Sequence, residues 1–430
     1  MELTKQKYKQ TEVGLIPDDW KLVPFDTIFS FYSTSNYSKA QMSEDDEVGC
    51  IHYGLIHAIK NTKYDLKHGI KYYVTSEQAK CEFVRDGDVI MVDASEDLEG
   101  VNKSVEVFGV GNNKYISGLH TYLLRDKKSL LADNFRGMVL NSQSVKNQML
   151  KLAVGMKVFG VSKTQLINVK IALPPTLVEQ KAIATVLSDV DELISNLDQL
   201  ITKKKAIKQG AMQQLLTPPH KGGKRLTGFT GEWVETSLDD VAWYQEGPGL
   251  RKWQFTDKGI KVINITNLVN GYLDLDKTQR HISWEEFNKM YQHFEIDEND
   301  IVVASSGNSY CKTAVIRKQD LPLVMNTSVI RFKPKENLDY KLLLIFLKST
   351  LFKDQIDLLI TGGAQPNFGP AHLRKVHIML PPTKEEQSAI ANILYDMEIN
   401  IEELFFKKAK YQDIKQGMMQ ELLTGKTRLV

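Results

Sequence analysis

The chain has 430 residues, which is enough for two or three domains with hydrophobic cores of their own. Apolar residues make up 42% of it and charged residues 25%, which excludes a collagen, a disordered tail and a disulfide-stapled miniprotein. Its 55 Lys and Arg against 53 Asp and Glu leave a formal charge of +2, which excludes a uniformly basic nucleic-acid coat but not a local basic face. Three scattered cysteines, no run of 18 apolar residues and a polar start without a signal-peptide pattern lead us to expect a cytoplasmic protein without a membrane span.

The first part of the chain, residues 1–172, mixes short strands with helices. Apolar and alternating runs predict strands at 87–93, 120–125 and 168–173 and a helix over 135–152. Pro174 and Pro175 end the last of these strands, because proline cannot donate to a sheet. We expect this part to form one mixed α/β domain.

A long helix follows in the segment 173–217. The sequence Thr176-Leu-Val-Glu179 fits a T-x-x-E capping box, in which the threonine hydroxyl accepts from a free backbone amide and the glutamate reaches back to the N-cap amide. A helix from Thr176 to Leu216 is roughly 60 Å long at 1.5 Å per residue. Such a helix is expected to be too long to bury its apolar stripe against its own small domain.

The second half of the chain repeats this plan. Residues 218–379 are again mixed, with strands predicted at 300–304, 328–332 and 375–380 and a helix over 342–352. The segment that follows begins with residues 380–424, which align with 173–217 without a gap and are identical at 23 of 45 positions. The period is too long for a solenoid, so the repeat indicates a duplicated half-molecule.

Both predicted long helices carry apolar residues at alternating steps of four and three, the spacing of a coiled-coil seam. The seam residues are Ile183, Leu187, Val190, Ile194, Leu197, Ile201, Ile390, Leu394, Met397, Ile401 and Leu404. Because the linker after the first helix is short, the second helix can cover this seam within one chain only by running back. We therefore expect an α+β protein in which two mixed α/β domains are joined by two long antiparallel helices with pseudo-twofold symmetry and neighbouring chain ends.

The sequence carries no credible catalytic, cofactor-binding or metal-binding constellation. It has no G-x-x-x-x-G-K-[ST] loop, no H-E-x-x-H, no C-x-x-C and no Asp/Asn-Pro-Pro-Tyr methylation motif. Cys50, His52 and His57 are too few for a closed metal site, and Asp18-Asp19-Trp20 fits a turn before a strand better than a nuclease cluster. We therefore predict a non-catalytic recognition or scaffold protein.

Polar, glycine-containing loops near the predicted strand ends are candidate ligand-binding loops. Residues 153–166 align with 360–373, and Arg251-Lys252-Trp253 places positive charge beside an aromatic ring, as nucleic-acid surfaces do. Plain capping loops explain the same composition about equally well. The candidate contact residues are His120, Lys157, Lys163, Arg251, Lys252, Asn308, Tyr310, Lys312, Gln365 and Asn367.

Each long helix also carries a glycine in a repeated Ile-Lys-Gln-Gly-x-Met-Gln sequence. Glycine costs about 1 kcal/mol inside a helix. Its presence in both halves indicates a close approach of the other helix or of a partner's backbone, although inheritance from one ancestral half explains it as well. The candidate partner-docking residues are Gln209, Gly210, Gln416 and Gly417. The acid-free basic stretch from Gln199 to Gly231 fits either a solvated helix end or a contact with phosphate or an acidic partner.

These motifs resemble those of the specificity subunits of type I restriction-modification systems. The resemblance rests on the opening GLIPDDWKLVPFDTI, on the two LPP-x3-EQ-x-A-IA segments, on their I-K-Q-G-x-M-Q ends and on Gly425-Lys-Thr-Arg-Leu429. The first copy departs from the pattern by Pro218-Pro219 and a small insertion. The resemblance implies that each mixed domain is a target-recognition domain that reads one half of a split, asymmetric sequence in double-stranded DNA, with the candidate loop residues as DNA contacts.

The resemblance also implies that the helices set the gap between the half-sites and dock two methyltransferase subunits, to which two restriction subunits can be added. S-adenosylmethionine, ATP and Mg would then bind the partner subunits and not this chain. The implied segments are a first target-recognition domain (1–172), a central spacer helix (173–217), a linker with the second target-recognition domain (218–379) and a distal spacer helix (380–430). The alternative function is a coiled-coil scaffold or adaptor without DNA readout.

Overall fold

The computed structural model describes residues 7–97, 100–155, 159–360 and 366–429. The chain divides into two units, which we call the first unit (1–199 with 406–430) and the second unit (200–405). The four segments predicted from the sequence are thus grouped into two units, because each long helix contributes one half to each of them. In the described part of the chain, no helix is both long and apolar enough to cross a membrane.

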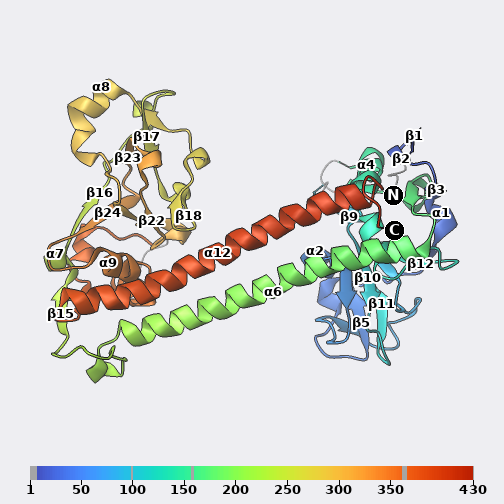
Figure 1. Ribbon diagram of the computed structural model, residues 1–430, viewed down its shortest axis with the longest axis horizontal. Helices are drawn as coiled ribbons and strands as arrows, with labels where there is room; N and C mark the ends of the chain where they lie inside the picture. Colours follow the sequence, from blue (N-terminus) through green and yellow to red (C-terminus); the bar gives the residue numbers. More distant parts are fainter. Residues whose placement is uncertain (1–6, 98–99, 156–158, 361–365, 430) are drawn as a thin grey trace, which may run out of the picture. The chain divides into compact units, whose positions relative to one another are not determined.

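Two helices of 39 residues each dominate the chain, α6 (Leu177–Leu215) and α12 (Lys384–Leu422) (Figure 1). Both begin one residue after the predicted N-cap threonine, and Thr176 Oγ1 accepts from the amide of Glu179 at 3.2 Å as predicted. The other half of the predicted capping box is wrong. The buried Glu179 carboxylate forms a two-bond ion pair with Arg428, one bond of which measures 2.8 Å, because this guanidinium lies within reach.

The halves of α6 and α12 that belong to the first unit pack antiparallel. Lys415 Nζ lies 2.5 Å from Asp191 Oδ1, and Lys408 Nζ lies 2.5 Å from Asp198 Oδ1. The residue number thus falls by seven along α12 as it rises by seven along α6. The antiparallel arrangement predicted from the short linker is confirmed.

The second unit shows the same antiparallel sense. Lys208 Nζ lies 3.1 Å from Glu398 Oε2, while Lys205 Nζ lies over the ring of Phe405 at 4.6 Å. The described chain ends meet in the first unit, where the hydroxyl of Tyr8 donates to the carbonyl of Lys426 at 3.2 Å.

The described part of the mixed domain of the first unit contains two sheets of more than two strands and three two-stranded pairs. The largest has the order β4 (Phe29–Tyr32), β12 (Thr121–Asp126), β8 (Val89–Val92), β10 (Ser104–Phe108) and β6 (Lys63–Asp65). A second has the order β11 (Lys114–Ser117), β5 (Val48–Ile51) and β7 (Tyr73–Val74), and a third pairs β3 (Lys21–Pro24) with β14 (Lys170–Leu173). Smaller pairs are β1 (Tyr8–Thr11) with β2 (Gly14–Pro17) and β9 (Ala94–Ser95) with β13 (Phe159–Gly160).

The mixed domain of the second unit has sheets in the corresponding order. Its largest sheet runs β16 (Ala242–Glu246), β24 (Val329–Pro334), β21 (Ile301–Ala304) and β22 (Thr313–Val315). The three-stranded sheet runs β20 (His281–Ile282), β17 (Ile260–Ile263) and β23 (Leu323–Met325), β15 (Val234–Ser237) pairs with β25 (His377–Leu380), and β18 (Leu268–Val269) pairs with β19 (Tyr272–Leu273). The two domains therefore share four strands of the largest sheet, the three-stranded sheet and the pair of β3 with β14 or β15 with β25, although their sequences differ strongly outside the repeat.

Short helices connect these strands. They are α1 (Phe25–Ile28), α2 (Tyr53–Ala58), α3 (Phe135–Leu140), α4 (Gln143–Leu152), α5 (Lys163–Leu166), α7 (Leu238–Val241), α8 (Trp284–Glu286), α9 (Tyr340–Leu347), α10 (Thr350–Leu359) and α11 (Pro370–Leu373). Each of the two helices predicted as continuous is divided in two. The reason is a serine that starts a new helix: Ser142 Oγ accepts from the amide of Val145, and Ser349 Oγ accepts from the amide of Phe352.

Each long helix begins inside the core of a mixed domain. Ile183 and Leu187 are fully buried in the core of the first unit, and Ile390 and Leu394 in that of the second. The first turns of each stripe are therefore buried against a mixed domain, and the rest of the stripe extends beyond that core. Farther along the stripe, Val190, Leu197, Ile201 and Ile401 are buried, and Ile194, Met397 and Leu404 are partly buried.

Candidate nucleic-acid interface

In the first unit, two candidate loops meet beyond the end of β8. The amide of Val161 donates to the carbonyl of Asp93 at 3.2 Å, which joins the loop before α5 to the loop after β8. Lys163 opens α5, and its ammonium group lies over the rings of Phe31 and Tyr122 at 5.5 and 5.6 Å. Lys163 is thus an exposed positive charge that rests on two aromatic side chains.

His120 lies beside the same loop junction. Its φ of 55° is left-handed, and its Nδ1 lies 3.4 Å from Asp93 Oδ1. Its ring meets the half-exposed ring of Tyr53 edge-on at 5.4 Å. Burial raises the pKa of Asp93, although His120 and Lys163 oppose that shift. The structure thus brings His120 and Lys163 together around one carboxylate, while the predicted contact Lys157 lies outside the described residues.

In the second unit, the equivalent loops also meet. Ser306 pairs with Asn367 as an isolated bridge, and the amide of Gly307 donates to the carbonyl of Pro366 at 3.0 Å. Asn367 and the neighbouring Asn308 are both exposed on this junction. Two amide side chains, each both donor and acceptor, are thus presented from adjacent loops. The predicted contact Gln365 lies outside the described residues.

Tyr310 and Lys312 differ in their surroundings. The Tyr310 hydroxyl donates to Asp357 Oδ1 and accepts from Lys353 Nζ at 2.6 Å, so it fastens its loop to α10. Lys312 is exposed and lines a small hollow with Asn270. Of these two candidates, Lys312 is the one placed to meet an external ligand.

Arg251 and Lys252 lie at a short 3-10 turn, η3 (Lys252–Gln254). Both are exposed, and neither forms a side-chain ion pair with any described residue. Trp253, between Lys252 and the buried Gln254, is 80% exposed. This turn presents two positive charges and an indole ring to solvent.

The two helix glycines do not mark a close approach of the helices. A Cβ added at Gly210 or Gly417 would meet no described atom within 4 Å, and both glycines are exposed together with Gln209 and Gln416. The interpretation as a contact between the two long helices is therefore wrong. Contact with a partner's backbone and simple inheritance remain the two explanations.

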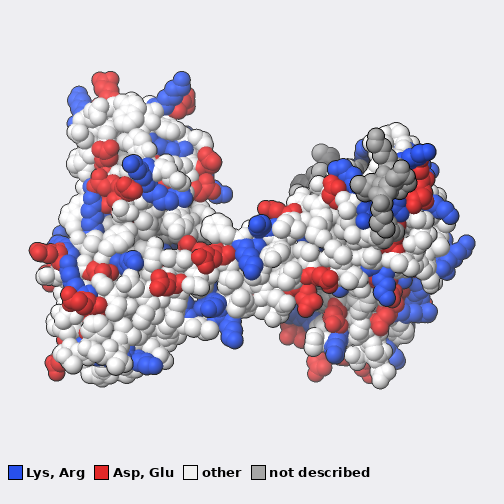
Figure 2. Space-filling model, viewed as in Figure 1, with Lys and Arg blue, Asp and Glu red and all other residues white. Residues whose placement is uncertain are grey.

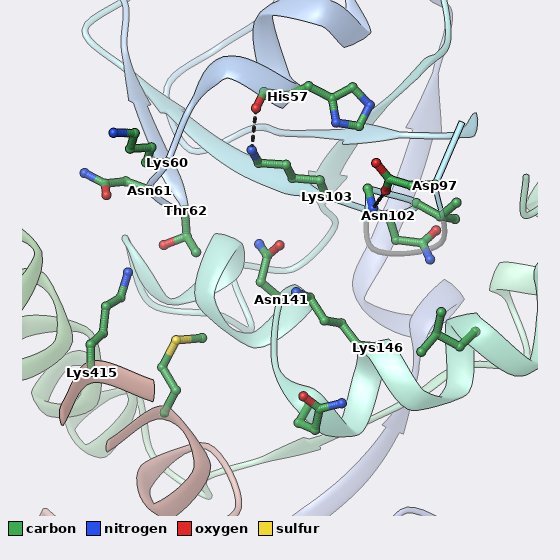
Figure 3. Close-up of a pocket in the computed structure, with 15 residues that line it drawn as sticks. His57, Lys60, Asn61, Thr62, Asp97, Asn102, Lys103, Asn141, Lys146 and Lys415 are labelled. Atoms are coloured by element: carbon green, nitrogen blue, oxygen red, sulfur yellow. Dashed lines mark hydrogen bonds between the residues drawn. The ribbon is translucent and has the colours of Figure 1, made fainter. Parts of the chain in front are cut away.

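A basic cavity of about 750 Å³ lies in the first unit between the mixed domain and α12 (Figure 3). Its basic lining residues are His57, Lys60, Lys103, Lys146 and Lys415. Lys103 Nζ donates to the carbonyl of His57 at 2.8 Å, and burial together with the charge of Lys146 lowers the pKa of Lys103. Lys415 is paired with Asp191, and Asp97 is the one acid among the described lining residues, so the positive charge of the cavity comes from Lys60, Lys103 and Lys146 and suits an anion.

Sequence reasoning missed this cavity, although its lysines recur in the second half. Lys146 and Lys353 lie at the repeat offset of 207, as do Lys415 and Lys208. Lys103 precedes β10 as Lys312 precedes β22, and these strands hold the same place in their sheets. On the face drawn in Figure 2 positive and negative side chains are interspersed on each unit, so basic character is local rather than general. Among the described residues no three His, Cys, Asp or Glu side chains gather as a metal site.

Comparison with known proteins agrees with this architecture. The family model described as type I restriction modification DNA specificity domain matches residues 17–209 and again residues 230–413. The chain is 28% identical over 437 residues to the type I restriction enzyme MjaVIII specificity subunit of Methanocaldococcus jannaschii, with 99% of this chain and 97% of that protein covered.

Two solved structures share the fold. The crystal structure of the type I restriction-modification S subunit from M. genitalium has a TM-score of 0.56 at 14% identity, with 94% of this chain and 96% of that chain covered. A chain from a structure of type I R-M complex assembly and conformational transition has a TM-score of 0.61 at 14% identity, with coverages of 96% and 99%. Since the family model matches most of the chain, in two copies, the chain belongs to the family of type I restriction-modification specificity subunits.

Proposed function

We propose that each mixed domain reads one half of a bipartite, asymmetric site in double-stranded DNA. The observation that carries the proposal is that two domains of one topology present different side chains from equivalent loops. The first unit offers Asp93, His120 and Lys163 where the second offers Asn308 and Asn367. Because base edges are read by the pattern of donors and acceptors, two such surfaces suit two different half-sites.

The frame beneath these loops is the same in both domains. Arg125 Nε lies 2.7 Å from Asp88 Oδ1, with its guanidinium over the ring of Tyr32 at 4.3 Å. Such a pair fixes β12 to the start of β8 and to the neighbouring β4.

The second domain has the same combination of an arginine–aspartate ion pair and a cation–π contact. Arg331 Nη1 lies 3.3 Å from Asp300 Oδ2, with its guanidinium over the ring of Trp243 at 4.9 Å. The equivalent lysines Lys103 and Lys312 are also present in both domains. Residues that are shared by two domains with different target sequences suit contacts that do not depend on the DNA sequence. A lysine that binds a phosphate group makes such a contact.

We further propose that the long helices set the gap between the half-sites and dock two methyltransferase subunits. Exposed glycines at Gly210 and Gly417, each beside an exposed glutamine, leave room for a partner's backbone on both helices. The chain itself is then non-catalytic, and S-adenosylmethionine, ATP and Mg bind to the partner subunits. These partners include up to two restriction subunits. Such a complex works in the cytoplasm, where prokaryotic DNA lies.

The test is to map methylated adenines in cells that hold the methyltransferase subunits with and without this chain. We expect one bipartite motif that appears only with the chain. The alternative, a scaffold without DNA readout, predicts no motif and no salt-dependent DNA binding by the assembled complex. Methyl transfer by the purified chain alone with S-adenosylmethionine would contradict the non-catalytic role.

A further inference from the structure

Two short 3-10 turns have the same internal structure in the two domains. The turn η1 (Lys39–Gln41) follows Ser38 and reads Ser-Lys-Ala-Gln, whereas η3 follows Arg251 and reads Arg-Lys-Trp-Gln. Gln41 Oε1 accepts from the amide of Ser38 at 3.0 Å, and Gln254 Oε1 accepts from the amide of Arg251 at 2.7 Å. The glutamine therefore closes both turns in one way.

Each turn is also anchored to the equivalent strand of its own domain. Ser43 pairs with Tyr73 in the first domain, and Thr256 pairs with His281 in the second. The amides of Ser43 and Thr256 donate to the partner carbonyls at 3.0 and 2.8 Å. Tyr73 begins β7 and His281 begins β20, and these strands hold the same edge of the three-stranded sheet. The two turns are therefore equivalent in the fold.

The equivalent turns differ at two positions only. Lysine is the same in both, at 39 and 252, whereas Ser38 and Ala40 are replaced by Arg251 and Trp253. With 80% of its surface exposed, Trp253 contributes little to the core of its domain. Folding of the domain thus gives no reason for a tryptophan at this place, while an external ligand does.

In the first domain the turn lies on the face that carries His120. Lys39 Nζ lies over the ring of Tyr72 at 5.4 Å, and that ring is 4.9 Å from His52. His52 is 5.9 Å from Tyr53, which in turn is 5.4 Å from His120. A continuous series of ring contacts therefore joins the turn to the loop junction beyond β8.

In the second domain the turn is joined to the corresponding junction through the backbone. Gly247, shortly before the turn, lies so close to the carbonyl of Asn326 that an added Cβ would be only 2.2 Å from its oxygen. The next residue, Thr327, accepts a hydrogen bond from Ser305 Oγ at 3.2 Å, and Ser306 pairs with Asn367. Each turn is thus connected to the loop junction of its domain, through ring contacts in the first domain and through the backbone that precedes the turn in the second.

We infer that these turns are base-reading elements and that residues 38 and 40 in the first domain and 251 and 253 in the second help to specify the two half-sites. The inference rests on the proposed function. Trp253 offers a flat ring for stacking or for wedging between bases, and Arg251 suits guanine O6 and N7. Ala40 suits contact with a thymine methyl group, and the shared lysine contacts phosphate in both domains.

The same domain provides a matched control. Trp284 is also exposed, at 49%, but it is followed by Glu285 and Glu286. Two carboxylates beside an indole ring repel a phosphate backbone. Trp284→Ala removes a second exposed tryptophan of the same domain and leaves residues 251–254 and the bond from Gln254 to Glu286 in place.

The experiment uses the full chain assembled with its methyltransferase subunits. Methylated adenines are mapped in cells, and affinity is measured for a duplex that carries the mapped motif. We expect the double variant Arg251→Ser with Trp253→Ala to lose discrimination in the second half-site only and to bind this duplex about tenfold more weakly or worse, the size of one stacking contact. The reciprocal variant Ser38→Arg with Ala40→Trp should change the first half-site only, and Trp284→Ala should change neither.

The outcomes separate the two ideas. A wild-type complex without a bipartite motif refutes the proposed function itself. A wild-type motif that stays unchanged, with unchanged affinity, in the double variant at 251 and 253 overturns the role of the turn. So does a variant that assembles poorly with the methyltransferase subunits but keeps its affinity for the duplex, because the turn is then a docking surface for a partner protein.

Discussion

Arg428 offers a stringent test of how each unit is held together. It lies in the tail after α12 and returns to the first turn of α6, where its Nη2 lies 2.8 Å from Glu179 Oε2. The Glu179 side chain is fully buried and that of Arg428 is 16% exposed. Removing one partner of a buried ion pair leaves an unpaired charge and costs about 3–5 kcal/mol. The second partner of Arg428, Asp19, accepts two bonds at 2.9 and 3.0 Å but is half exposed, so without Arg428 its charge stays solvated and costs less than that of Glu179. Arg428→Ala should therefore destabilise the chain by about 3–5 kcal/mol.

Urea unfolding followed by tryptophan fluorescence measures this change, because Trp20 lies below the Arg428 guanidinium at 6.0 Å. Lys426→Ala is the matched control in the same tail, since its ion pair with Glu421 is solvent-exposed, and it should unfold like the wild type. Adding Glu179→Gln to Arg428→Ala should restore more than half of the loss, because the uncompensated charge is then gone. Equal stability of the Arg428 and Lys426 variants, or no recovery in the double variant, would refute the reasoning.

Three further predictions concern the domains, the helices and pH. Replacing residues 1–172 by the corresponding domain of another family member should change one half of the methylated motif, and a change in both halves would contradict independent reading. Four residues inserted between Leu197 and Lys203 lengthen α6 by about 6 Å and keep its seam nearly in register, so the mapped gap should shift by one or two base pairs; an unchanged gap would show that the helix does not set it. Burial by itself raises the pKa of Glu398, but two lysine ammonium groups outweigh it and hold the pKa below the ordinary 4.5. Its ion pairs therefore stabilise the second unit above that pH and are lost as the pH falls, so Glu398→Gln should flatten the loss of thermal stability between about pH 6 and pH 3.

The helical part of the fold was predictable because the two halves of the chain repeat it. The steps of four and three, the capping threonines and the short linker together predicted the first helix to within one residue at each end, the start of the second to within one residue, and their antiparallel sense. The repeat also contains the ion pairs. Asp191 with Lys415 and Glu398 with Lys208 occupy positions 207 apart in each half, so that one interaction is made twice, once in each unit.

The mixed domains were harder to predict because insertions shift their equivalent positions. The offset is 207 for Lys146 and Lys353, but Lys103 corresponds to Lys312 and Ser38 to Arg251 at other offsets, so no single alignment reveals them. Only strand pairing establishes which loop residues correspond. For the same reason the 3-10 turns and the basic cavity were not recognised as common features.

The Glu179 error has a different physical origin. A capping box is a local pattern, but the carboxylate found a stronger partner in a guanidinium 249 residues away. A buried carboxylate gains more from a bidentate, charged donor than from a single backbone amide. Local sequence patterns therefore predict the helix start correctly and the partner of its glutamate incorrectly.

Two ion pairs join the beginning of one long helix to the segment that follows the other, so that each unit contains residues from both halves of the chain. Arg428 follows α12 yet binds Glu179 at the start of α6, and Arg225 follows α6 yet binds Glu386 at the start of α12 at 2.7 Å. Each pair fixes the end of one long helix to the beginning of the other, inside one unit. The interactions that hold the two helix ends of each unit therefore lie in or next to the repeated segments and not in the loops of the mixed domains. The positions of the sequence therefore fall into two groups with different roles. Under the proposed function, positions that are alike in the two halves maintain the frame and its common contacts, and positions that differ on that frame determine which bases each half reads.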